Sequence, residues 1–427
     1  MEKLEYGCIG EHLGHSYSAE IHALLGTYRY RLCELAPQEV EGFLRARAFR
    51  GVNVTIPYKQ TVMPFLDEID RTSREIGAVN TILCRGGRLI GYNTDFYGMR
   101  MLLRRAGIDP QGRFAAVLGT GGTSLTACAV LRAMGAAHIV RVSRMPAGDG
   151  VPGTETVSYD ELLRRRAEVE IIINTTPVGM YPRDEGLSVD PAEFPCLYGI
   201  ADAVYHPLRT NLVCRGLERG IPSAGGLYML VAQAAQAAAL FLDRPDTVQD
   251  TERVFRTIRE RKENIVLIGM PGSGKSTLGK QVAERTGKAF ADSDELFAAR
   301  IGMTPADFIK AHGENAFRLK ETAVLRELAA ENGYVIATGG GVVTRQENVR
   351  VLRRNGRLVW LDRPVCDIQP TADRPLTCDR EALERVYRER ESLYRDAAAL
   401  HVAVSGTPAE AADRLLASLR YAAETEE

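Results

Sequence analysis

Residues 264–276 read NIVLIGMPGSGKS, a short β-branched apolar run that leads directly into a glycine-rich turn. The part at 269–276, GMPGSGKS, matches the GxxxxGK[ST] pattern found between a buried parallel strand and a helix. Backbone N–H groups at the start of such a helix surround phosphate oxygens. The stretch therefore predicts an α/β domain of the P-loop NTPase type, with a parallel sheet, that binds ATP or GTP.

The residue types in this turn also predict separate roles. Lys275 is expected to neutralise charge on the transferred phosphate, and Ser276 is expected to ligate Mg²⁺. The remaining residues predicted to hold the nucleotide are Gly272, Gly274 and Thr277.

A second strand and glycine turn, FAAVLGTGGTS at 114–124, lies in the first half of the chain. Its glycines, Gly119, Gly121 and Gly122, are typical of a Rossmann unit, although glycines alone are a weak signal. The next predicted strand ends in Ser143 and Arg144, where an NAD-binding unit usually offers a carboxylate to the ribose hydroxyls. Arg144 instead suits a 2′-phosphate, which favours NADP.

Length and composition limit the class of protein. The chain has 427 residues, too many for one ordinary domain, and its net charge of -1 gives no overall field that attracts nucleic acid or anionic lipid. Eight scattered cysteines without a CxxC pair, and a start without a secretory signal, indicate a reducing cytoplasm. We expect a cytoplasmic enzyme that acts on small molecules and has no nucleic-acid or membrane partner. The sequence does not specify the oligomeric state.

Strand-like and helix-like segments alternate along the chain, which predicts an α/β class throughout. Residues 243–263 are rich in charge and predict a linker with a solvated helix before a second domain at 264–427. The uncharged segment 224–242 is long enough for a membrane span. Its alanines and two glutamines favour a buried helix instead.

Motifs downstream of the P-loop narrow its function. FADSDE at 290–295, GENAFRLKE at 313–321, ATGGG at 337–341, ADRPL at 372–376 and RESLY at 390–394 follow in order. With them, residues 264 to about 420 resemble shikimate kinase. The resemblance implies that Asp294 binds the acceptor hydroxyls and acts as base, and that Asp292 supports Mg²⁺. It also implies that Arg318 and Arg390 hold the acceptor carboxylate, with help from Glu321 and Gly340. The lid residue Arg374 would close over the ATP phosphates. Thr377 and Ser392 depart from the family pattern in and after the lid.

The first half contains a Lys and an Asp at separate predicted strand ends, in GVNVTIPYK at 51–59 and GYNTD at 91–95. A Lys59–Asp95 pair can stabilise and protonate the alkoxide formed when a ketone accepts hydride. Further motifs are GHSYSAEIH, GAVNTI, INTTPVGM, DAVYHP and GGLYMLVAQA, and with them residues 1 to about 243 resemble shikimate dehydrogenase.

This second resemblance implies a substrate domain at 1–100, an NADP-binding Rossmann domain at 101–223 and a helix at 224–242 that returns to the first domain. It implies that the substrate is bound by Ser16, Ser18, Thr55, Asn80, Asp95, Tyr205 and Gln233. It places Asn174, Thr175 and Met180 beside the nicotinamide. Ser143, Met145 and Leu125 depart from the family pattern, so NAD use stays open.

Together the two resemblances predict a bifunctional enzyme of chorismate and aromatic amino acid biosynthesis. It would reduce 3-dehydroshikimate to shikimate with NADPH and then phosphorylate shikimate with ATP and Mg²⁺ to shikimate 3-phosphate. Two alternatives stay open at this point. One is a quinate/shikimate dehydrogenase fused to the same kinase, and the other is a shikimate-sensing regulator built from degenerate enzyme domains.

Overall fold

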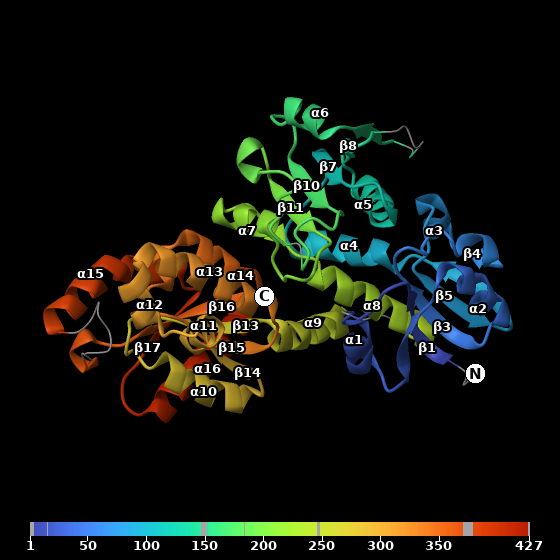
Figure 1. The fold of residues 1–427 in the computed structure, drawn as a ribbon. Helices are drawn as coiled ribbons and strands as arrows, with labels where there is room; N and C mark the ends of the chain where they lie inside the picture. The colour runs from blue at the N-terminus through green and yellow to red at the C-terminus, as the bar shows by residue number, and fades with distance from the viewer. Residues whose placement is uncertain are drawn as a thin grey trace. The chain divides into compact units, whose positions relative to one another are not determined.

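A computed structural model describes residues 4–14, 16–146, 151, 153–182, 184–245, 248–369 and 379–425. The chain divides into two compact units, Met1–Ile258 and Arg259–Glu427 (Figure 1). Sheets flanked by helices make up both units, which confirms the predicted α/β class. The first unit contains two sheets and the second contains one.

The first sheet of unit 1 has the strand order β2-β1-β3-β5-β6-β4. Strands β1 (Leu4–Gly10), β2 (Tyr30–Glu34) and β3 (Phe49–Val54) are parallel, whereas β5 (Thr81–Arg85) and β6 (Arg88–Tyr92) form an antiparallel hairpin. Gly86 and Gly87 have φ values of +56° and +76°, which a two-residue hairpin turn requires. The short strand β4 (Glu68–Ile69) pairs with β6 at the edge.

The second sheet of unit 1 is parallel, with the order β12-β11-β10-β7-β8-β9. Its central strands are fully buried apolar runs, as expected for parallel strands covered on both faces. The strands are β7 (Phe114–Leu118), β8 (His138–Val142), β9 (Glu155–Val157), β10 (Ile171–Asn174), β11 (Gly199–Asp202) and β12 (Ser223–Ala224). Helix α5 (Gly122–Ala133) follows β7 directly.

Helices α4 (Thr94–Arg105) and α8 (Leu227–Leu242) pack closely in the core of unit 1. Gly98 makes this approach possible, because a Cβ there would lie 2.6 Å from the carbonyl oxygen of Met229. Most side chains of α8 are buried, and among the described residues no helix is long and apolar enough to cross a membrane. The prediction of a buried helix at 224–242 is therefore confirmed.

Helix α9 (Val248–Lys262) occupies the stretch predicted as a charged linker. The helix is present, but it is not solvated on every side, because Thr251, Val254, Phe255 and Ile258 are buried, the last three in the core of unit 1. This spacing forms one narrow apolar stripe, which the high average charge of the segment conceals.

Unit 2 is built on a parallel sheet of order β14-β15-β13-β16-β17. The strands are β13 (Asn264–Ile268), β14 (Ala289–Asp292), β15 (Tyr334–Ala337), β16 (Gly356–Asp362) and β17 (Leu400–Ala403). The helices that matter for the site are α10 (Lys275–Thr286), α11 (Ser293–Ile301), α13 (Glu314–Ala330) and α15 (Arg380–Ala397). The carboxyl ends of β13, β14 and β15 share one edge, where open α/β sheets bind ligands.

Candidate active sites

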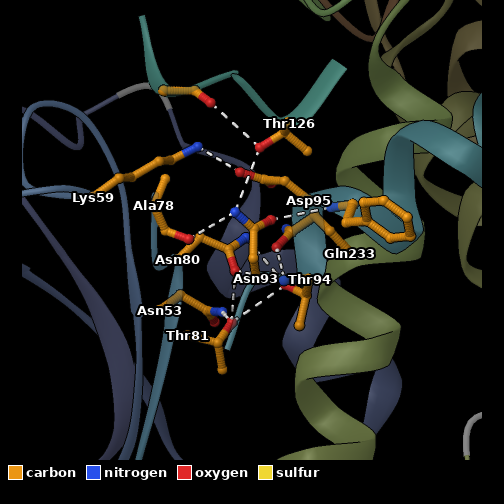
Figure 2. Close-up of polar contacts among 12 residues, drawn as sticks. Asn53, Lys59, Ala78, Asn80, Thr81, Asn93, Thr94, Asp95, Thr126 and Gln233 are labelled. Carbon is orange, nitrogen blue, oxygen red and sulfur yellow. Dashed lines mark hydrogen bonds and ion pairs between the residues drawn. The ribbon is translucent and has the colours of Figure 1, made fainter. Parts of the chain in front are cut away.

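An ion pair joins the two predicted catalytic residues of unit 1 (Figure 2). Lys59 follows β3, and Asp95 lies in the first turn of α4, which Asn93 caps by accepting a hydrogen bond from the Phe96 amide. Lys59 Nζ lies 2.5 Å from Asp95 Oδ2, and the two side chains are only 15% and 9% exposed. A pair so poorly solvated is held firmly and can exchange a proton with a bound ligand.

Asn80 and Gln233 lie in the same cluster, although they are far apart in sequence (Figure 2). Asn80 Oδ1 accepts a hydrogen bond of 2.7 Å from the Thr94 amide. Thr94 Oγ1 in turn lies 3.3 Å from Gln233 Oε1. The start of α4 therefore lies beside Asn80, which directly precedes β5, and beside Gln233 on α8. Both residues belong to the predicted substrate site.

The other predicted substrate residues lie at strand and helix ends. Ser16 Oγ is 3.0 Å from Ser18 Oγ at the start of α1 (Ser18–Leu25), and Thr55 follows β3. Tyr205 packs against Tyr17, with ring centroids 5.2 Å apart. Burial raises the pKa of Tyr205, so its phenol stays neutral.

The glycine turn after β7 fits a dinucleotide. Gly119 has φ +107°, and a Cβ there would lie 2.9 Å from Thr175 Oγ1, so only glycine suits this position. Gly121 forms the N-cap of α5, which directs amide N–H groups toward a pyrophosphate. Arg144 is exposed just after β8, where it can meet a 2′-phosphate.

Asn174, predicted to lie beside the nicotinamide, has a fully buried side chain. Its Nδ2 donates to Asp202 Oδ1 over 2.9 Å, and its Oδ1 accepts from the Thr176 amide. Burial raises the pKa of Asp202 to about 6. Asn174 thus positions the loop after β10, whereas Thr175 is partly exposed and Met180 is 45% exposed.

The phosphate-binding turn of unit 2 has the predicted form. Gly272 and Gly274 adopt φ values of +82° and +95°, and Lys275 Nζ donates to the carbonyls of Gly269 and Met270 over 2.9 and 2.8 Å. This geometry holds the lysine across the turn, beside the N-terminus of α10 that carries Thr277.

A candidate Mg²⁺ site adjoins the turn. Ser276 Oγ donates to Asp292 Oδ2 over 2.6 Å, and these oxygens are of the kind that Mg²⁺ prefers. Within the described ranges, no group of three or more His, Cys, Asp and Glu could hold a metal. Mg²⁺ usually binds through one or two protein oxygens together with nucleotide phosphates, and Ser276 and Asp292 offer two such oxygens. Asp292 also caps α11, accepting from the Asp294 amide.

Two buried guanidinium groups meet the triple-glycine turn after β15. Arg318 on α13 pairs with Glu321 and Glu314 at 2.9 Å each, and its guanidinium lies against Gly341. Burial acts to lower the pKa of Arg318, but the two carboxylates raise it overall. Arg390 on α15 donates to the Gly340 carbonyl over 3.1 Å. Such paired guanidiniums suit an anionic acceptor.

Two acidic side chains border this turn. A Cβ at Gly339 would lie 2.9 Å from Asp294 Oδ1 and 3.0 Å from Glu321 Oε1. Burial raises the pKa of Glu321, with Arg318 opposing the shift. The structure thus brings together Asp294, Arg318, Glu321, Gly340 and Arg390, as predicted from the motifs.

The lid residues Arg374 and Thr377 lie outside the described residues. The sequence reasoning also missed several residues around the two sites. Tyr394 was missed, although RESLY contains it; its hydroxyl donates to the Gly340 carbonyl, and burial raises its pKa to about 12. Asn53 and Thr81 were also missed, although both stand in quoted motifs.

These features define an α/β nicotinamide-dependent dehydrogenase followed by a P-loop kinase. Family models agree: "Shikimate dehydrogenase substrate binding domain" matches residues 8–82, and "Shikimate kinase" matches residues 271–420. A shikimate dehydrogenase (NADP(+)) of Halothermothrix orenii is 40% identical over 259 residues, covering 55% of this chain and 89% of that protein. The chain belongs to the shikimate dehydrogenase family and carries in addition a shikimate kinase domain.

Solved structures resemble the first unit. Shikimate dehydrogenase 1 from Peptoclostridium difficile has a TM-score of 0.56 and 32% identity, covering 60% of this chain and 97% of that one. The shikimate 5-dehydrogenase from Thermus thermophilus, in complex with NADP(H) and shikimate, has a TM-score of 0.54 and 31% identity, covering 60% of this chain and 99% of that one. A quinate dehydrogenase from Corynebacterium glutamicum, in complex with NAD, has a TM-score of 0.53 and 25% identity, covering 60% of this chain and 99% of that one.

Proposed function

We propose that this chain catalyses two consecutive reactions. The first unit reduces 3-dehydroshikimate to shikimate with NADPH, and the second transfers a phosphoryl group from ATP to shikimate, giving shikimate 3-phosphate. The observation that carries the proposal is the joining of these two families in one chain, because the product of the first is the acceptor of the second.

In the first reaction Lys59 acts as the general acid. NADPH, when bound, supplies the hydride to the carbonyl carbon. As the C=O electron pair moves onto oxygen, Lys59 Nζ donates a proton to that oxygen and later regains one from water. Asp95 holds the ammonium at 2.5 Å and accepts a hydrogen bond from a substrate hydroxyl.

In the second reaction the protein mainly positions groups and neutralises charge. Arg318 and Arg390 hold the shikimate carboxylate, and Asp294 accepts the proton of the attacking hydroxyl. Lys275 leaves its carbonyl partners to contact the phosphates as negative charge moves toward the leaving group. Mg²⁺, held by Ser276 and supported by Asp292, supplies further charge neutralisation when bound.

The choice of NADP rests on the exposed Arg144 after β8. Quinate turnover is the second candidate, because a quinate dehydrogenase is among the structures that resemble the first unit. The ratio of kcat/KM for shikimate to that for quinate separates the two. We further propose that the protein acts on small molecules in the cytoplasm.

Paired substitutions test the proposal. Lys59→Met should lower NADPH-dependent reduction by at least about a hundredfold, the usual contribution of a general acid, and leave phosphorylation intact. Lys275→Met should do the reverse. Each variant's unaffected activity serves as its folding control. Loss of both activities in either variant would contradict two separate sites, and turnover at neither site in the native chain would indicate a regulator.

A further inference from the structure

A buried line of polar side chains crosses the first sheet of unit 1 and ends at the predicted substrate residues. It begins at Tyr30 on β2 and continues through Asn53 on β3 and Thr81 on β5. Asn53 and Thr81 lie directly opposite each other in the antiparallel pairing of β3 and β5. It then reaches Asn80, Thr94 and Gln233. We call these six residues the amide relay (Figure 2 draws the last five).

Two backbone groups fix the orientation of the amides at its end. The Thr94 amide N–H, which can only donate, lies 2.7 Å from Asn80 Oδ1. The Leu230 carbonyl, which can only accept, lies 2.9 Å from Gln233 Nε2. Neither amide can therefore exchange its oxygen and nitrogen without losing a hydrogen bond.

The fixed amides then assign the donors and acceptors next to them. Tyr30 donates to Asn53 Oδ1 over 2.7 Å, and Asn53 Nδ2 donates to Thr81 Oγ1 over 3.0 Å. The Thr81 hydroxyl lies 3.1 Å from Asn80 Oδ1, to which it can donate, and 3.2 Å from Thr94 Oγ1. Burial raises the pKa of Tyr30 well above its ordinary value, so the first donor keeps its proton.

The relay continues beyond Asn80. Asn80 Nδ2 donates to Thr94 Oγ1 over 3.1 Å, and the Thr94 hydroxyl lies within donating distance of two acceptors, Asn80 Oδ1 at 3.2 Å and Gln233 Oε1 at 3.3 Å. Asn80 Oδ1 thus has both lone pairs engaged, by Thr81 and by the Thr94 amide.

We infer that the relay makes Asn80 a donor-only group toward the substrate and fixes Gln233 with its amide N–H available, and that Tyr30, Asn53 and Thr81 are positioning residues that enforce this polarity. Within the described residues, Asn80 Nδ2 and Gln233 Nε2 each spend one N–H on the protein, so each offers its second to a ligand. The matching ligand groups are acceptor oxygens. A hydroxyl that accepts from Asn80 and donates to the carboxylate of Asp95 satisfies both.

This inference rests on the proposed dehydrogenase activity, and it predicts a specific kinetic signature. Thr81→Val keeps the shape but removes one hydroxyl donor to Asn80 Oδ1 and the acceptor of Asn53 Nδ2, so KM for shikimate should rise about three- to tenfold, as for the loss of one neutral hydrogen bond. The kcat and the KM for NADP⁺ should change less than about twofold, because Lys59 and the cofactor turn are untouched. Thr81→Ser, which restores the hydroxyl, should return KM to near the native value.

Tyr30→Phe and Tyr28→Phe form the matched pair. Both remove a partly buried phenol hydroxyl, but that of Tyr28 lies 2.5 Å from His22 Nδ1, whereas that of Tyr30 lies 2.7 Å from Asn53 Oδ1. Tyr30→Phe should raise KM, and Tyr28→Phe should not. The inference is overturned if Thr81→Val raises KM no more than Tyr28→Phe, or if Thr81→Ser fails to restore it. If Thr81→Val does not fold, the Tyr30 and Tyr28 pair decides. An inactive native chain would instead contradict the proposed function.

Discussion

Gly98→Ala should impair the dehydrogenase site by displacing Gln233, although Gly98 itself is not one of the predicted substrate residues. Gly98 lies on α4, and an added Cβ would sit 2.6 Å from the Met229 carbonyl oxygen and 3.0 Å from Gln233 Cβ. Since real Cβ atoms essentially never approach closer than 3.0 Å, α8 must move by about 0.4 Å in a core packed to near-crystal density.

Overpacking of this kind costs about 1–3 kcal/mol. Because the shift carries Gln233 away from Thr94, whose hydrogen bond is already 3.3 Å long, KM for shikimate should rise about three- to tenfold. Thermal unfolding should show the first unit destabilised by a few degrees. Steady-state kinetics of the kinase reaction in the same preparation should be unchanged, because all these contacts lie in unit 1.

Gly42→Ala is the matched control. Gly42 lies within helix α2 (Val40–Ala46), and among the described residues nothing lies within 4 Å of an added Cβ. The substitution should be neutral or stabilise by about 0.5–1 kcal/mol through helix propensity. If Gly98→Ala matches Gly42→Ala in both stability and KM, the close approach of α4 and α8 does not set the position of Gln233.

Three further predictions concern other groups. Asp292→Asn should raise the Mg²⁺ concentration for half-maximal kinase activity about tenfold, because it removes the carboxylate beside Ser276; an unchanged Mg²⁺ titration would contradict this. Arg318→Lys should raise the kinase KM for shikimate about tenfold and leave the KM for ATP unchanged, because a lysine cannot form the bidentate pair of hydrogen bonds that an arginine forms with a carboxylate. The pKa of Asp202 rises from 3.8 to about 6 on folding, so stability should fall by about 3 kcal/mol as pH rises from 4 to above 6. Asp202→Asn should flatten that part of the stability profile measured by chemical denaturation.

The sequence was most informative where local pattern and chemistry coincide. The apolar runs before Gly119 and Gly269 predicted two buried parallel strands, and the structure contains both, as β7 and β13. Lys59 and Asp95 were paired from their motifs, and the ion pair is present. In these cases, a strand end and its following turn contain all the information needed.

Features that depend on tertiary pairing were not visible in the sequence. The relay needs Asn53 opposite Thr81, a register that only the folded sheet defines. The buried side chain of Asn174 donates its hydrogen bond to Asp202, which lies on the neighbouring strand and 28 residues further along the chain. The apolar stripe of α9 becomes evident only when the core that covers Val254 is present.

The central claim is that one chain performs both reactions in sequence. The most direct test incubates the purified protein with 3-dehydroshikimate, NADPH, Mg²⁺ and ATP, following NADPH absorbance and identifying products by mass spectrometry, with ATP omitted in a parallel sample. We expect NADPH loss in both samples, shikimate alone without ATP, and shikimate 3-phosphate when ATP is present. Unchanged NADPH absorbance in both samples, or shikimate that accumulates unphosphorylated in the presence of ATP, would contradict the central claim.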